Sequence, residues 1–210
     1  SRTIAKVTAP GALVDRIPLP SWAERKRLIT TAITKTQRWI ESFVIDLNLC
    51  PFAHQVKKSD AIHYTVSDSE APHEILRALH EEISYLDGDQ VAETSFLILT
   101  KGMKGFREFN DWLAMGQSLL EMMDWVGTYQ LVGFHPHHQF AGTDPEDAEN
   151  YTNRSPYPMV HILRESSVTR ALEAGEDVAL ITERNTDTLN QLGIERLIER
   201  WQDCCTEHLE

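Results

Sequence analysis

The sequence is short of cysteine, of long apolar runs and of positive charge. Its 210 residues include three cysteines, Cys50, Cys204 and Cys205, and an odd number without a secretory signal argues against a disulfide framework. No run approaches the roughly 20 apolar residues of a membrane span, and the N-terminus has no apolar signal core. Lysine and arginine total 20 against 32 acidic residues, a net charge of −12. This balance disfavours nucleic-acid and anionic membrane surfaces. We therefore expect a cytoplasmic protein that binds neither nucleic acid nor membranes.

What the chain does contain is an alternation of helix and strand patterns. Hydrophobic residues make up 41% of it, enough for a core at this length. An extended lead over residues 1–20 is rich in proline. Ser21 and Glu24 then form a capping-box pattern at the start of a long amphipathic helix that ends near Asn48. Further helices are predicted over Ala71–Leu86, Phe106–Trp125, Ser167–Ala174 and Asp187–Cys205, the last interrupted at Gly193.

Four short runs have strand character: Ala61–Val66, Ser95–Thr100, Tyr129–Phe134 and Met159–Leu163. The second, SFLILT, is continuously apolar, which is typical of a central strand covered on both faces. Strands that alternate with helices predict parallel crossovers, whereas the fourth strand follows a long loop and is expected to run antiparallel. The predicted fold is a single α/β domain over residues 1–210. It has a four-stranded, mostly parallel or mixed sheet flanked by helices, a long N-terminal helix and a helical C-terminal tail.

The passage from Leu131 to Arg164 gathers four of the nine histidines and most of the unusual polar residues. His135 lies at the end of a predicted strand, where sites in α/β sheets are usually built. In NYTNRSPYP, two prolines restrict the backbone and present Arg154 and Tyr157 in a defined direction. The guanidinium groups of Arg154 and Arg164 suit a carboxylate or phosphate. Local turn hydrogen bonds by the asparagines and a surface ion pair of Arg154 remain the alternative.

Cys50 is the candidate reactive thiol outside that passage. The pattern places it at the C-terminal end of the first helix, where the helix dipole disfavours a thiolate. A buried cysteine that behaves as a small apolar residue fits the pattern as well. The loop Lys101–Gly105 follows a predicted strand and precedes a helix, so it is a weaker candidate for an anion contact. It lacks the spacing of a phosphate-binding P-loop.

Three motifs together resemble a known family. They are LNLCPFA (Leu47–Ala53), GFHP (Gly133–Pro136) and NRSPYP (Asn153–Pro158), followed by His161 and Arg164. The chain is similar in them to a family of bacterial proteins of unknown function, domain-of-unknown-function family 1415. The resemblance covers most of the chain from the first helix onward. It implies a single-domain bacterial protein whose polar motifs belong together, and it implies no particular activity or cofactor.

Three functional hypotheses remain open on the sequence alone. The first is a thiol-dependent hydrolase or transferase for a small anionic substrate. In it Cys50 is the nucleophile, His135 the general base, and Asn153 orients the base or stabilises an oxyanion. Substrate contacts are predicted from Arg154, Tyr157, His161 and Arg164. The second is a metal-binding hydrolase that uses His135, His137 and His161. The third is a non-enzymatic binding module for an anionic metabolite. The acidic surface and five tryptophans leave room for a homodimer.

Overall fold

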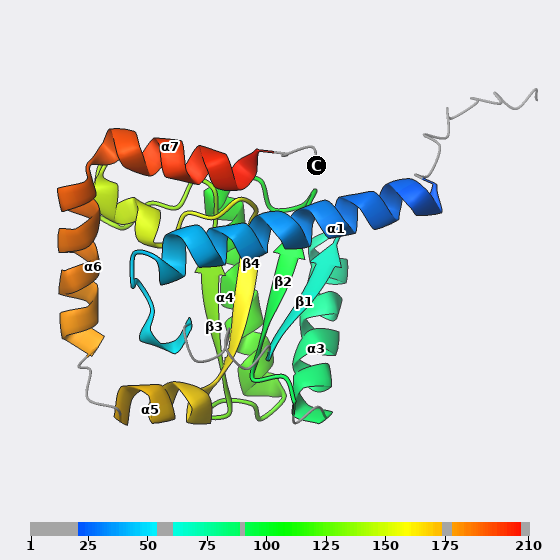
Figure 1. Cartoon of the computed structure of the whole chain (residues 1–210). Coiled ribbons are helices and arrows are strands. Elements are labelled where there is room, and N and C mark those ends of the chain that lie inside the picture. The colour runs from blue at the N-terminus through cyan, green and yellow to red at the C-terminus, as the bar shows by residue number, and fades with distance from the viewer. Residues whose placement is uncertain (1–20, 54–60, 89–90, 174–177, 207–210) are drawn as a thin grey trace, which may run out of the picture.

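The structure, a computed structural model, describes residues 21–53, 61–88, 91–173 and 178–206. The extended lead predicted for residues 1–20 lies outside this part of the chain. A four-stranded sheet stands at the centre, with helices on both faces (Figure 1). The strands and helices follow one another in the order that the sequence predicts.

The sheet is mixed. Its strands are β1 (Ile62–Ser67), β2 (Thr94–Leu99), β3 (Tyr129–Phe134) and β4 (Met159–Arg164), in the spatial order β1-β2-β4-β3. β1 and β2 are parallel, whereas β4 runs antiparallel to both of its neighbours. The prediction of an antiparallel last strand is confirmed, and the sheet has one parallel pair. A loop instead of a crossover helix precedes β4, so the chain can reverse and enter between β2 and β3.

Two helical layers enclose the sheet. The regular helices are α1 (Trp22–Trp39), α3 (Pro72–Gly88), α4 (Phe106–Met122), α5 (Glu165–Glu173), α6 (Val178–Leu192) and α7 (Ile194–Cys205). A π-helix, η1 (Ile40–Ile45), continues α1, and a 3-10 helix, η2 (Ala148–Thr152), lies in the loop before β4. α3 and α4 cover one face of the sheet, while α1 crosses the other face with α7 beside it (Figure 1).

The alternation of side chains along the strands divides the interior into two cores. On β2, Leu97 and Leu99 join the core under α3 and α4, while Phe96 and Ile98 join the core under α1. Every residue of β2 is buried, as the continuous apolar run predicted. The same alternation decides on which face each polar strand residue lies.

The first helix begins and ends as its sequence signals indicate. Ser21 Oγ accepts from the Glu24 N–H at 3.3 Å, and the Ser21 N–H donates to the Glu24 carboxylate at 2.7 Å, which completes the capping box. Residues 21–30 are exposed, and this part of α1 projects beyond β1 (Figure 1). In η1 each backbone hydrogen bond spans five residues instead of four, as in the bond of 3.0 Å from the Asp46 N–H to the Glu41 carbonyl. Asn48, with φ 52°, ends the helical path.

Candidate functional site

A pocket lies between the α1 layer and the sheet, and we call it the α1 pocket. It holds about 410 Å³ of empty space, its open mouth included. α1 and η1 form its wall, all four strands contribute to its floor, and the segment after η1 forms one side. Its apolar lining consists mainly of Ile40, Val44, Phe52, Ile62, Phe96 and Phe134. The described residues that line it include no lysine, arginine, aspartate or glutamate; polar side-chain atoms come from Cys50, Thr94, His161 and Trp39.

Cys50 lies at the side of this pocket, half-buried and outside any disulfide. The left-handed backbone of Asn48 separates it from η1. Pro51, Phe52 and Ala53 are helical again, and the Ala53 N–H donates to the Cys50 carbonyl at 3.2 Å. Cys50 therefore precedes a helical stretch and is not in the last turn of the first helix. The dipole argument against a thiolate, which assumed that last turn, does not apply here.

His161 faces the same pocket from β4. Its Nε2 lies 2.7 Å from Thr94 Oγ1, and that hydroxyl donates its proton to the Ile162 carbonyl at 2.6 Å. Because a hydroxyl has a single proton, His161 Nε2–H is the donor and Nδ1 carries the lone pair. The ring stacks on Phe96 with centroids 4.0 Å apart. Burial lowers the pKa of His161 to about 3, so the imidazole is neutral at physiological pH.

Trp39 closes the α1 pocket at the end of α1. Its side chain is 1% exposed, and its ring meets Phe134 edge-on with centroids 5.0 Å apart. Its indole Nε1–H has no hydrogen-bond partner within the described residues. A buried indole N–H normally finds an acceptor. Among the described residues, this indole is therefore a buried donor without an acceptor.

The structure places His135 on the opposite side of the sheet. Its ring packs against Phe106 and Phe109 of α4, each with centroids 5.4 Å apart, and is fully buried. Nε2 lies 3.1 Å from the Met103 carbonyl, and Nδ1 accepts the His137 N–H at 2.9 Å. Both ring nitrogens are thus bonded to the backbone, and burial lowers the pKa of His135. The structure does not bring His135 together with the α1 pocket.

The metal-ligating trio of the second hypothesis is divided in the same way. His161 stacks on a residue of the α1-side core, whereas His135 packs on α4 and the side chain of His137 is exposed. Use of His135 as a ligand would break one of its two backbone hydrogen bonds. Across the described ranges, no group of three or more histidine, cysteine or acidic side chains is arranged to hold a metal ion. This part of the chain gives the metal hypothesis no geometric support.

Asn153 and Tyr157 hold the loop before β4 in place. Asn153 Nδ2 donates to the Gly133 carbonyl at 3.4 Å, and the Asn153 carbonyl accepts the His135 N–H at 3.1 Å. Tyr157 is half-buried against the α1-side core, and its carbonyl accepts from Ser155 Oγ at 2.6 Å. The Asn153 contacts join this loop to the end of β3, so they are not the local turn hydrogen bonds that the sequence left as an alternative for the asparagines; the bond between Ser155 and Tyr157 is local.

The two arginines lie at opposite ends of the sheet. Arg154 donates through Nε to the His138 carbonyl at 3.2 Å, and its guanidinium lies 4.6 Å from the Tyr151 ring centre. Its Nη2 donates to the Pro145 carbonyl. Arg164 pairs across the sheet with Tyr129, the first residue of β3, whereas Arg154 contacts the loop beyond the last residue of β3. They therefore do not converge on one anion.

Arg164 is bound to the end of α3. Nε donates to the Ala92 carbonyl at 3.3 Å and Nη1 to the Tyr129 hydroxyl at 3.1 Å. Nη2 donates to the carbonyl of Leu86, in the last turn of α3. A cation that bonds the last carbonyls of a helix stabilises that helix end. This arrangement accounts for Arg164 without a ligand.

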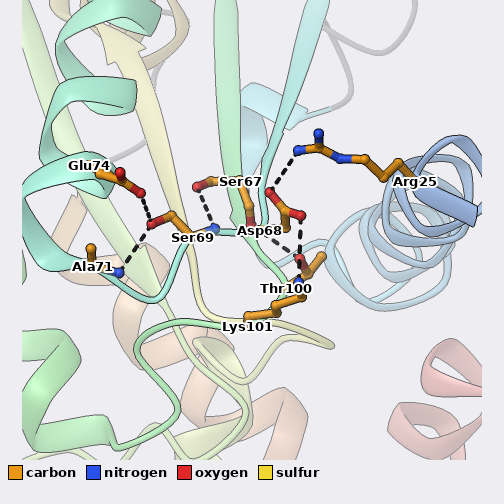
Figure 2. A network of polar contacts seen from close by, with 8 residues as sticks. All are labelled: Arg25, Ser67, Asp68, Ser69, Ala71, Glu74, Thr100 and Lys101. Atoms are coloured by element: carbon orange, nitrogen blue, oxygen red, sulfur yellow. Dashed lines mark hydrogen bonds and ion pairs between the residues drawn. The ribbon is translucent and has the colours of Figure 1, made fainter. Parts of the chain in front are cut away.

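The basic side chain of the loop after β2, Lys101, forms an ion pair with Asp68, which follows β1. Lys101 Nζ lies 3.6 Å from an Asp68 oxygen, and the other oxygen of that carboxylate lies 3.3 Å from Arg25 Nη2 (Figure 2). Met103 has φ 58° and is 2% exposed, so the loop turns its side chain into the core. Gly102 is packed so closely that a Cβ would lie 2.6 Å from the Ser69 carbonyl. The two ion pairs of Asp68 make Lys101 part of a network at the ends of β1 and β2, and the packing of Gly102 and Met103 fixes the course of the loop.

Sequence reasoning did not single out Thr94 or Trp39. Trp39 belongs to the apolar stripe of an amphipathic helix and was interpreted as core, which it also is. Thr94 directly precedes the apolar run of β2. One signal was present: alternation along β4 puts His161 on the face opposite Val160 and Ile162. A polar residue on the same face of β2 is then its natural partner.

These features define a mixed α/β protein with a small apolar pocket that carries one thiol and one neutral imidazole. The chain belongs to the family described as protein of unknown function (DUF1415), whose model matches residues 31–199. The predicted membership in this family is thereby confirmed. The match includes every candidate site residue named above and begins in α1 just before its first buried residue, Ala32. No curated protein and no solved structure matches the chain.

Proposed function

We propose that this protein is a thiol-dependent enzyme, a hydrolase or an acyl transferase, and that the α1 pocket is its active site. The observation that carries the proposal is that Cys50 and His161, from distant segments of the chain, line the same apolar pocket. Catalytic cysteines commonly work beside a histidine. In this proposal His161 takes the role that the sequence assigned to His135, because His135 is bonded to the backbone on the other side of the sheet.

The chemistry requires one covalent intermediate. Cys50 Sγ adds to the acyl carbon of the substrate as the thiol proton passes to His161 Nδ1. The leaving group departs with that proton, and a thioester remains on Cys50. Water, or the hydroxyl or amine of an acceptor, then attacks the thioester and restores the thiol. Because burial lowers the pKa of His161, the imidazole is neutral at rest and its Nδ1 lone pair can accept the thiol proton as the attack proceeds.

The pocket favours an uncharged group at the reacting end of the substrate. Its described lining offers no cation to a carboxylate or phosphate, and a buried unpaired charge is costly. Arg154 and Arg164 donate to backbone carbonyls elsewhere. We therefore propose a neutral acyl substrate in place of the small anionic substrate that the sequence suggested. The cytoplasmic location and the homodimer stay predictions.

A panel of p-nitrophenyl esters with acyl chains of increasing length tests the proposal. We expect hydrolysis above background in the parent protein, loss of that activity in Cys50→Ala, and a strong reduction in His161→Phe. Cys205→Ser is the matched control, since Cys205 is also half-buried but lies in α7 outside the pocket. Activity that persists in Cys50→Ala, or that disappears equally in Cys205→Ser, would refute the role of Cys50.

A non-enzymatic binding protein is the second candidate. The observation in its favour is the low pKa of His161, about 3, because a neutral imidazole does not hold a thiolate in a resting ion pair. This candidate predicts that ligands stabilise Cys50→Ala as strongly as the parent protein and that no ester is turned over. Thermal shift measurements on both proteins with the same esters and with the corresponding ketones distinguish the two functions.

A further inference from the structure

We infer that three side chains of the C-terminal helices, Arg184 and Asn185 of α6 and Arg200 of α7, are positioning residues for Cys50. Each donates a hydrogen bond to a backbone carbonyl in the segment that leads from η1 to the thiol. Together they fix where Cys50 lies beside the α1 pocket. The inference rests on the proposed function for the catalytic role of Cys50, whereas the hold on the backbone can be measured without a substrate.

The first step concerns the carbonyl of Ser42, in the π-helix. In a regular α-helix the Asp46 N–H would donate to it, but here that N–H donates to the Glu41 carbonyl at 3.0 Å. The Leu47 N–H, which a further π-turn would offer, also bonds a different carbonyl. Arg200 Nη1 of α7 donates to the Ser42 carbonyl in their place. The widened turn is thus completed by a side chain from the C-terminal helix.

The second step concerns the two residues before Cys50, where the chain turns through the left-handed Asn48. Arg184 Nη2 donates to the Asn48 carbonyl at 3.0 Å. Asn185 Nδ2 donates to the Leu49 carbonyl at 2.8 Å, and both of these residues are buried. The Leu49 carbonyl belongs to the same planar peptide unit as the Cys50 N–H. The bond from Asn185 therefore fixes the place of the Cys50 Cα, from which the thiol side chain extends.

The third step separates positioning from stability. Asn185 Oδ1 is a buried acceptor without a hydrogen-bond partner within the described residues. The asparagine thus satisfies one buried carbonyl and leaves another buried oxygen unsatisfied, so it contributes little net stability. What it does supply, and a leucine of similar size would not, is a fixed orientation of the peptide before Cys50. A displacement of about 1 Å at a reacting group can cost about 100-fold in rate.

Hydrogen exchange measured by NMR tests the hold on the backbone. The reporters are the amides of Leu49 and Ala53, which flank Cys50 and are both hydrogen-bonded. In Asn185→Leu we expect both to exchange about tenfold faster than in the parent protein, because the local segment opens more readily. The amides of β2 should keep their rates. Asn190→Leu is the matched control, since Asn190 is an exposed asparagine of the same helix, and it should leave all rates unchanged.

The thiol itself should respond in two opposite directions. Iodoacetamide should alkylate Cys50 about tenfold faster in Asn185→Leu, because local opening exposes a half-buried side chain more often. Peptide mass spectrometry separates Cys50 from the other two cysteines. Turnover of a p-nitrophenyl ester should nevertheless fall about tenfold in kcat, with KM changed less than about twofold. A thiol that is more accessible and yet less active is the signature of lost positioning.

Arg200 gives a second test that does not depend on the folding of Asn185→Leu. Its side chain is 35% exposed, so Arg200→Met should be tolerated while it removes the donor to the Ser42 carbonyl. We expect the same pattern of faster local exchange, faster alkylation and lower kcat. Arg200→Lys keeps one donor and should restore most of each value. Arg196→Met is the control, because Arg196 is an exposed arginine one turn away in α7.

The inference is overturned by unchanged exchange at Leu49 and Ala53 in Asn185→Leu, or in Arg200→Met if the former does not fold. Faster exchange that spreads equally to β2, alkylation that does not speed up, or an unaltered kcat beside faster local exchange also overturns it. Inert esters in the parent protein would instead refute the enzyme. The exchange and alkylation rates alone would then decide whether α6 and α7 hold the backbone at Cys50.

Discussion

Replacement of Arg164 by methionine is the sharpest test of what that residue does. The side chain donates to the carbonyls of Ala92 and Leu86 and to the hydroxyl of Tyr129. Methionine keeps much of the length and volume but none of the donors. A hydrogen bond from a charged group contributes about 1.5–3 kcal/mol, and a neutral one about 1 kcal/mol. Because the side chain is half-exposed, water replaces part of what is lost, and we take about 1 kcal/mol for each bond.

The expected loss for Arg164→Met is therefore about 3 kcal/mol, which corresponds to a fall in Tm of about 6–12 °C for a chain of this size. Urea unfolding followed by circular dichroism at pH 7.5 gives the free energy directly. Arg154→Met is the control: two loop carbonyls lose their donor, and we expect a loss of about 1 kcal/mol. A change below about 1 kcal/mol in Arg164→Met, combined with lost binding of an anion such as benzoate, would show that the structural role is wrong.

Three further predictions concern the histidines, Thr94 and Gly102. Burial lowers the pKa of His161 to about 3 and of His138 to about 4, from an ordinary value of 6.5. Between pH 6.5 and 4 these histidines are protonated in the unfolded chain but not in the native protein, so the free energy of unfolding should fall as the pH drops through this range. Urea midpoints measured across the range should decline less steeply in His161→Phe. Thr94→Val removes the acceptor of His161 Nε2–H and should cost about 1–3 kcal/mol. Its ¹⁵N spectrum should show a mixture of His161 tautomers, and an unchanged spectrum would contradict our assignment. Gly102→Ala places a Cβ 2.6 Å from the Ser69 carbonyl and should cost about 1–3 kcal/mol, seen as a lower urea midpoint; a midpoint equal to that of the parent protein would disprove the close contact.

The parts of the fold that follow from local chemistry could be predicted. The capping box at Ser21, the buried run of β2 and the antiparallel course of β4 depend on neighbouring residues or on the lack of a crossover helix. The position of β4 between β2 and β3 could not be predicted in the same way. A loop without regular patterning lets the strand join any free edge, and long-range pairing decides among them.

The candidate site was predicted in part, for a similar reason. Alternation indicates that neighbouring residues such as Phe134 and His135 face opposite sides of the sheet. The sequence does not say which side α1 covers, so it could not tell whether Cys50 would meet His135 or His161. The structure puts α1 on the face of Phe134 and His161. The asparagines and arginines of the loop show a further limit, because residue types suited to ligands are equally suited to backbone carbonyls.

The π-helix η1 leads to an expectation about the length of relatives of this chain. A π-turn holds one residue more than an α-turn, and such widened turns commonly mark functional sites. Loss of one residue between Trp39 and Asp46 would let ordinary helical hydrogen bonds form while the flanking segments keep their places. We expect relatives of this chain to differ there by a one-residue gap. In chains with the gap, the wall of the α1 pocket at Ile40 and Val44 would have a different shape. Such chains would bind different ligands, although their sheet would be the same.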